Sequence, residues 1–178
     1  MKTYKEYIKP IVVLSVLCLV VGAALALVNH ITAPLIAANK EAETNATYFA
    51  LLPDADAFTQ IEYESEGVTA VLKADNGAGY IVTAKSKGYS GDVPAAVAFS
   101  NDGSIIKVIM MDNDETPGMG QKVTEDSFCG QFAGMAAEEF TIDDIDAVSG
   151  STISSKAAVN AIDLAIRAYN DVIGGAAE

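Results

Sequence analysis

Hydroxyl side chains crowd around one glycine in the sequence D-A-V-S-G-S-T-I-S-S-K-A-A-V, which covers residues 146–159. The first N–H groups of a helix have no acceptor within the helix, and together with the helix dipole they attract anions. A helix that starts in this stretch could therefore hold a phosphate group. Serine and threonine are also the residues that most often cap a helix. The residue types alone leave both interpretations open, a phosphate site and a plain helix cap.

The neighbouring segments that must position this stretch are predicted to form an α+β domain. Apolar and polar residues alternate in several short segments, and Asn101-Asp102-Gly103 is a strong hairpin signal. Strands in a meander followed by helices favour an antiparallel sheet with packed helices over a doubly wound fold. We expect strands over residues 61–64, 68–73, 79–86, 93–99, 105–111 and 140–145, and helices over residues 34–52, 125–139 and 154–173.

A run of apolar residues without charged side chains, 11–28, precedes this domain. As a helix it would span about 27 Å, close to the bilayer's hydrocarbon thickness of roughly 30 Å. Because basic residues come before it, we expect the N-terminus to stay in the cytoplasm and the rest of the chain to lie outside. The predicted divisions are a cytoplasmic N-terminus over 1–9, a single transmembrane helix over 10–29, a membrane-proximal helical segment over 30–60 and an extracytoplasmic domain over 61–178.

A cleavable secretory signal peptide is the competing interpretation of the apolar run. Ala24-Leu25-Ala26 offers the small residues that a signal peptidase requires. The run is longer than the apolar part of a typical signal peptide, which favours an uncleaved anchor. Both interpretations export the C-terminal part of the chain, and we expect it at a bacterial cell (inner) membrane.

Composition excludes several classes of function. The formal charge is -13, from 24 acidic and 11 basic residues, and this excludes a general nucleic-acid binder. Cys18 and Cys129 cannot pair, because one lies in the predicted span and the other in the exported domain. With His30 as the single histidine, we expect no metal site and no histidine-based catalytic centre. We expect carboxylates such as Asp112 and Glu115 to be solvated rather than catalytic.

The crowded hydroxyl stretch resembles a motif of the FMN-binding domain family. Residues 146–155, D-A-V-S-G-S-T-I-S-S, are similar to the family's flavinylation motif, Asp-x-x-Ser/Thr-Gly-Ala-Thr-x-Thr/Ser-Ser. Ser151 stands in place of the usual alanine, and Ser154 in place of the usual threonine. The threonine that this family esterifies to the phosphate of FMN corresponds to Thr152.

Two further segments resemble the same family. Residues 88–93, G-Y-S-G-D-V, are similar to its Gly-Tyr-x-Gly element. Residues 114–123, D-E-T-P-G-M-G-Q-K-V, are similar to the Glu-Thr-Pro-Gly-Leu-Gly loop of the G subunits of Rnf electron-transport complexes, with Met119 in place of leucine. The three matches run in order over about 88–165. The single predicted span and the short chain also resemble those subunits.

The resemblance implies that FMN is bound covalently, through a phosphoester to Thr152. It implies that neighbouring residues surround the phosphate, namely Ser149, Gly150, Ser151, Ser154 and Ser155. It also implies that the flavin ring lies beside a second group, Tyr89, Glu115, Thr116, Pro117, Gly118, Met119 and Gly120, whose glycines leave room for a flat ring. Ordinary loop packing for Met119, a solvated acid for Glu115 and a plain sheet aromatic for Tyr89 stay open as alternatives.

The resemblance further implies a membrane-anchored flavoprotein that relays electrons in an Rnf-type ferredoxin/NAD oxidoreductase coupled to Na+ or H+ translocation. Such a chain would be an electron-transfer subunit of an enzyme complex and not a catalyst alone. Its partners would be the other membrane and peripheral subunits, a flavin transferase during maturation, and the lipid bilayer. Two alternatives stay open: a stand-alone flavinylated carrier outside the cytoplasm, and a non-redox membrane-anchored binding module.

Overall fold

The computed structural model describes residues 2–175. Met1, which belongs to the predicted segment 1–9, and residues 176–178 at the end of the predicted segment 61–178 lie outside the described residues. The contacts within the chain divide it into two compact units, one up to Asn45 and one from Ala46 onward.

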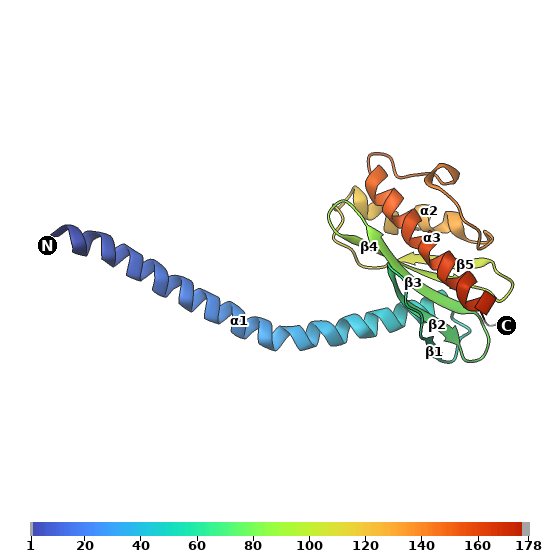
Figure 1. The fold of residues 1–178 in the computed structure, drawn as a ribbon, viewed down its shortest axis with the longest axis horizontal. Coiled ribbons are helices and arrows are strands. Elements are labelled where there is room, and N and C mark those ends of the chain that lie inside the picture. Colours follow the sequence, from blue (N-terminus) through green and yellow to red (C-terminus); the bar gives the residue numbers. More distant parts are fainter. Residues whose placement is uncertain (1, 176–178) are drawn as a thin grey trace. The chain divides into compact units, whose positions relative to one another are not determined.

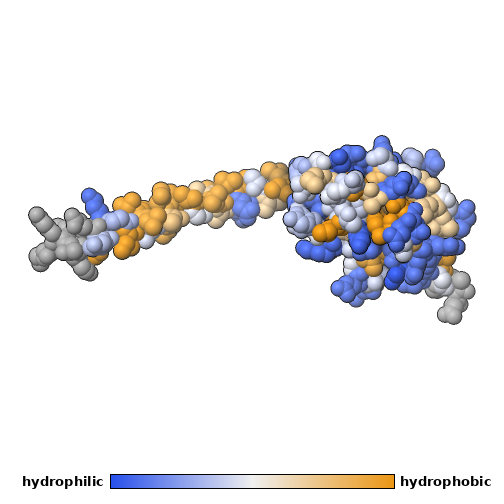
Figure 2. All heavy atoms as spheres, turned by 90° about the horizontal axis from the view of Figure 1, so that it is seen from above, coloured by the Kyte–Doolittle hydropathy of each residue, from blue (hydrophilic) through white to orange (hydrophobic). Residues whose placement is uncertain are grey.

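A single helix, α1 (Lys2–Leu51), forms the first unit and enters the second. The part from Tyr7 to Leu51, which contains the span predicted over 10–29, is long and apolar enough to cross a membrane. Figure 2 shows the apolar surface along this helix. The predicted helix 34–52 is continuous with the apolar segment, since Pro34 lies inside α1. Pro53 follows soon after its end, as expected for a residue that cannot continue a helix.

Five antiparallel strands form one sheet in the order β1-β2-β3-β4-β5, which confirms the predicted meander. The apolar patterns of the sequence placed the three central strands to within about a residue. Gly103 adopts φ +86° in the turn between the last two strands, as the hairpin signal requires. The strands are β1 (Phe58–Ile61), β2 (Val68–Ala74), β3 (Tyr80–Lys87), β4 (Asp92–Phe99) and β5 (Ile105–Met110).

Helix α3 (Thr152–Gly175) packs across one face of the sheet. Ile162 and Ile166 are fully buried there, at the four-residue spacing that puts both on one face of a helix. The Tyr169 ring stacks on Phe99 with centroids 4.3 Å apart. Its hydroxyl donates a hydrogen bond of 2.7 Å to the carbonyl of Ser100. These contacts fix the axial position of α3 on the sheet, and hence the position of its N-terminal end.

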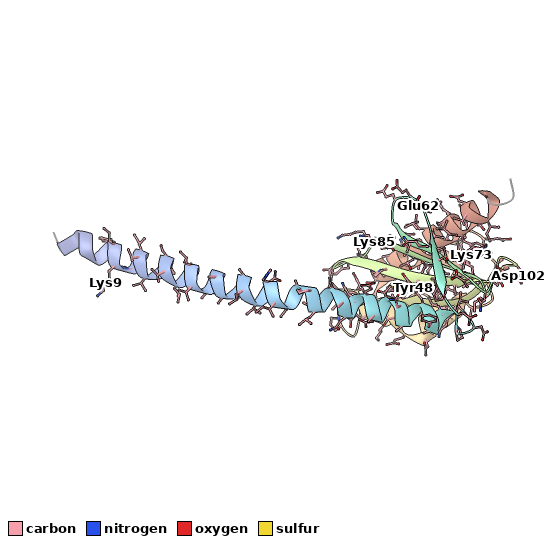
Figure 3. All side chains as sticks on the ribbon, turned by 90° about the horizontal axis from the view of Figure 1, so that it is seen from below. Lys9, Tyr48, Glu62, Lys73, Lys85 and Asp102 are labelled. Carbon is pink, nitrogen blue, oxygen red and sulfur yellow. The ribbon has the colours of Figure 1, made fainter. Side chains whose placement is uncertain are left out.

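The opposite face of the sheet is covered by the end of α1 and the residues that follow it. Leu51 and Leu52 are buried against Leu72 and Ile81. Tyr48, in the last turns of α1, also packs on this cluster (Figure 3). The sheet is therefore buried on both faces, which makes it a rigid support.

Two elements between the sheet and α3 differ from the prediction. The helix predicted over 125–139 is broken into two short turns, α2 (Asp126–Cys129) and η2 (Gly130–Phe132), which follow the 3₁₀ helix η1 (Gly120–Thr124). Gly134 then takes φ +82°, which a continuous helix does not allow. The periodic phenylalanines Phe128 and Phe132 do face the core, and their rings are 5.6 Å apart.

The strand predicted over 140–145 is wrong: this segment forms the short 3₁₀ helix η3 (Ile142–Asp144). The Asp144 carboxylate accepts a hydrogen bond of 2.9 Å from the Thr141 backbone N–H, and the Asp144 N–H donates to the Thr141 carbonyl. Reciprocal bonds of this kind favour a helical turn over an extended strand. The first strand lies at Phe58–Ile61 instead of 61–64.

Replacement of Ile162 by alanine tests the contact between α3 and the sheet. We expect a loss of about 2–5 kcal/mol in the free energy of unfolding, because the side chain is fully buried. Ile106→Ala serves as the control, since Ile106 is 40% exposed, and should cost about 1 kcal/mol or less. Urea unfolding of the detergent-solubilised chain, followed by tyrosine fluorescence, measures both; equal losses would contradict the packing described.

Candidate functional site

Glu115 joins three segments that lie far apart in the sequence. Its carboxylate oxygen Oε1 accepts hydrogen bonds from the backbone N–H groups of Ser90 at 2.9 Å and Gly91 at 3.5 Å. The other oxygen, Oε2, accepts a hydrogen bond from the Ser154 hydroxyl. The turn between β3 and β4, the loop after β5 and the first turn of α3 therefore meet at one side chain.

The meeting of these segments depends on two glycines. A Cβ atom at Gly88 would lie 2.5 Å from Oε1 of Glu115, and a Cβ atom at Gly120 would lie 2.8 Å from both Oε2 of Glu115 and the Ser154 hydroxyl oxygen. Neither position has room for a side chain. Gly88 of the Gly-Tyr-x-Gly segment and Gly120 of the Pro-Gly-Met-Gly segment thus make space for the carboxylate.

Glu115 is only 1% exposed, so the alternative that it is a solvated loop acid is wrong. Burial alone would raise the pKa of Glu115. The hydrogen bonds from the Ser154 hydroxyl and from the backbone N–H groups of Ser90 and Gly91 outweigh burial and hold the pKa below its ordinary value of 4.5. The carboxylate is therefore ionised at neutral pH and acts only as a hydrogen-bond acceptor.

A pocket of about 470 Å³ opens where the three segments meet. Cavities that bind small organic molecules typically measure roughly 300–1,000 Å³. The residues that line it are Tyr89, Glu115, Thr116, Met119, Gly120, Gly150, Ser151, Thr152, Ile153 and Ser154. Nine of these ten were singled out from the sequence; the tenth is Ile153, whose side chain is 55% exposed.

Four residues singled out from the sequence do not line the pocket: Ser149, Pro117, Gly118 and Ser155. Ser149 is exposed in the turn before α3. Gly118 takes φ +75° in the loop. The buried Ser155 accepts a hydrogen bond of 3.0 Å from the Val148 N–H and so fastens the preceding turn to α3.

Helix α3 starts at Thr152, two residues before the predicted start near Ser154. The Ser155 N–H donates to the Ser151 carbonyl at 2.9 Å. The N–H groups of Thr152, Ile153 and Ser154 come earlier and have no acceptor inside the helix. Gly150, with φ +81°, turns the backbone into the helix. The exposed residue Thr152 therefore lies on the pocket wall at the positive end of the helix dipole.

Gln131 is a supporting residue that the sequence analysis missed. Its side-chain amide accepts a hydrogen bond of 2.8 Å from the Asp146 N–H and donates one of 3.2 Å to the Asp146 carbonyl. This pair holds the segment that leads into α3 against the η2 turn. A lone glutamine in an apparent helix carries no sequence signal for such a role.

The comparisons with known proteins identify a domain family and relatives of the whole chain. Residues 88–167 match the FMN-binding domain family. The chain is 32% identical to the G subunit of the proton-translocating ferredoxin:NAD(+) oxidoreductase complex of Clostridium ljungdahlii, over 91% of each chain. It is 30% identical to the G subunit of the Na(+)-translocating ferredoxin:NAD(+) oxidoreductase complex of Acetobacterium woodii, over 95% of this chain and 94% of the relative.

The chain belongs to the family of Rnf-type G subunits. A solved structure, NqrC of Shewanella oneidensis, superposes with a TM-score of 0.52 at 20% sequence identity, over 66% of this chain and 70% of that one. This likeness concerns the fold alone.

The pocket residues fit FMN. The helix end with its backbone N–H groups and hydroxyls suits a phosphate group, since both favour negative charge. Three large, exposed side chains suit a flat ring system: Tyr89 at 70%, Met119 at 52% and Ile153 at 55% exposure. Met119 also lies beside the turn before α3, because its Cε lies 3.8 Å from the position a Cβ of Gly150 would take.

Replacement of Gly120 by alanine tests the arrangement around Glu115. The added methyl group would lie within 2.9 Å of the Glu115 side chain, and we expect a loss of about 1–3 kcal/mol in the free energy of unfolding. Gly130→Ala is the matched control: its Cβ meets nothing within 4 Å and its φ is -67°, so it should stabilise the chain by about 0.4–1 kcal/mol. Urea unfolding gives both values, and a change of the same sign in both would contradict the geometry.

Proposed function

We propose that this protein relays electrons through FMN that is joined covalently to Thr152, within an Rnf-type complex that transfers electrons between ferredoxin and NAD and translocates Na+ or H+. The observation that carries the proposal is the position of Thr152, an exposed residue on the wall of a ligand-sized pocket and at the N-terminal end of α3. Membership of the G-subunit family and the FMN-binding domain over 88–167 support it.

In the proposed site, Thr152 carries the attachment. When a flavin transferase modifies the chain, the hydroxyl oxygen of Thr152 would lose its hydrogen and form the bond to the FMN phosphorus. At the same time the phosphoanhydride bond of an activated FMN donor would break, and the other phosphate group of that donor would leave with the proton. The N–H groups of Ile153 and Ser154 stabilise the negative charge of the phosphoester, because they lack partners in the helix. A covalent link prevents FMN from dissociating. This matters for a domain outside the cytoplasm, where no pool of free FMN would replace a lost cofactor.

The rest of the pocket positions the ring. Tyr89 and Met119 offer an aromatic and a thioether surface. FMN supplies the redox chemistry when bound, while the protein sets the position of the ring and its electrostatic surroundings. Because the pocket walls are held by a sheet that is packed on both faces and by the helix across it, the ring would keep a fixed position for electron transfer.

The proposed topology follows from α1. Residues 10–29 would cross the lipid bilayer, and residues 1–9 with their lysines would stay in the cytoplasm. Residues 30–60 would connect the membrane span to the domain of residues 61–178, which would carry the flavin outside the cytoplasm. The transferase would then act on the outer side of the cell membrane, and the other subunits of the complex would supply and accept the electrons.

Replacement of Thr152 by alanine should abolish covalent FMN and leave the domain folded, because the exposed hydroxyl makes no contact on which the core depends. Intact-mass measurement of the chain co-expressed with a flavin transferase tests this. Thr124→Ala removes a threonine hydroxyl outside the pocket and should retain the full adduct. A flavin adduct of unchanged yield in Thr152→Ala defeats the assignment.

The sidedness is tested with a reporter enzyme fused after Glu178. A periplasmic reporter such as alkaline phosphatase should be active in this fusion, and a cytoplasmic reporter should not. Fusions after Lys9 give the matched control, for which the opposite pattern is expected. Cytoplasmic reporter activity at Glu178 would overturn the proposed orientation.

A further inference from the structure

The Glu115 carboxylate is a buried negative charge that is stabilised by hydrogen bonds and not by an ion pair with any described residue. The side chain is 1% exposed, yet it belongs to the pocket lining. The ion pairs of the residues that the structure describes link Lys85 and Lys87 to Asp92, and Arg167 to Glu139 and Asp163, so none includes Glu115. No other ionised side chain is therefore paired with this charge within the described chain.

The direction of each hydrogen bond to Glu115 is fixed. Backbone N–H groups of Ser90 and Gly91 can only donate, and an ionised carboxylate can only accept. The Ser154 hydroxyl must therefore donate its single hydrogen to Oε2 of Glu115. Toward a ligand, the Ser154 hydroxyl offers lone pairs, so neither it nor the Glu115 carboxylate presents a hydrogen-bond donor to the pocket.

We propose that the Glu115 carboxylate lowers the reduction potential of the flavin in this pocket. The inference rests on the proposed function, since it needs FMN between these three segments. Each electron that enters the ring adds one negative charge unless a proton follows. A fixed negative charge at a buried site is poorly screened and opposes that addition. The side chains of Glu115 and Ser154 also offer no hydrogen-bond donor that could stabilise the negative charge of a reduced ring. This too lowers the reduction potential of the flavin.

Glu115→Gln tests the proposal, because glutamine keeps the shape and removes the charge. Its carbonyl oxygen can still accept from Ser90 and Gly91, and its NH₂ group can donate to Ser154. The full-length chain, flavinylated by a co-expressed transferase and purified in detergent, is titrated with dithionite and redox dyes at pH 7. We expect a higher midpoint potential than in the wild type.

Asp114→Asn is the matched control: it removes the same charge from the adjacent, exposed residue, where solvent screens it. The positive shift should be larger for Glu115→Gln than for Asp114→Asn. No shift, or equal shifts in the two variants, would overturn the proposal.

Ser154→Ala keeps the proposal testable if Glu115→Gln does not fold. This variant retains the carboxylate and removes one of its donors, so the midpoint potential should fall or stay unchanged. A positive shift in Ser154→Ala would show that packing, and not the charge, sets the potential. Intact mass is measured first: a wild-type chain without a flavin adduct defeats the proposed function, whereas an adduct with equal potentials in all variants defeats this inference alone.

Discussion

The site depends on the need to satisfy one buried carboxylate. An ionised side chain without partners in the interior costs several kcal/mol. Glu115 avoids this cost only when the turn at Ser90 and Gly91 and the first turn of α3 at Ser154 are both in place. Segments separated by 25 and 39 residues are thereby brought to one point. The hydrogen bonds that satisfy the carboxylate also hold together the three segments that line the pocket. The shape of the pocket is therefore set by contacts within the protein.

The rest of the fold fixes the position of α3 and of the turn before it, next to Glu115. α3 is anchored far from its N-terminal end by the stacking of Tyr169 on Phe99 and by the buried isoleucines. Gln131 fastens the backbone of Asp146, and Ser155 fastens Val148, so the turn before α3 is also fixed. Thr152 is thus an exposed hydroxyl on rigid backbone, which suits both modification by another protein and a defined position of the attached group afterwards.

Sequence patterns predicted the sheet and α3 well, because alternation and three-to-four spacing report directly on burial. They failed over residues 125–145, where Gly134 and the Thr141–Asp144 bonds override composition. The motifs identified most pocket residues but left the state of Glu115 open. Its burial follows from partners distant in the chain, so a local pattern cannot distinguish it from its exposed neighbour Asp114. The hydrogen bonds of Gln131 also depend on a partner distant in the chain, and Ile153 lies between Thr152 and Ser154 without being part of the hydroxyl pattern.

The central claim, that Thr152 carries FMN as a permanent redox group, is tested most directly on protein from native membranes. Cleavage after Lys122 and Lys156 releases one peptide, 123–156, that contains the attachment segment. Fragmentation mass spectrometry should find that the mass of this peptide is increased by the mass of FMN less one water, and that the added mass is located on Thr152. A bare peptide, from cells in which other flavoproteins of this type are modified, would contradict the account.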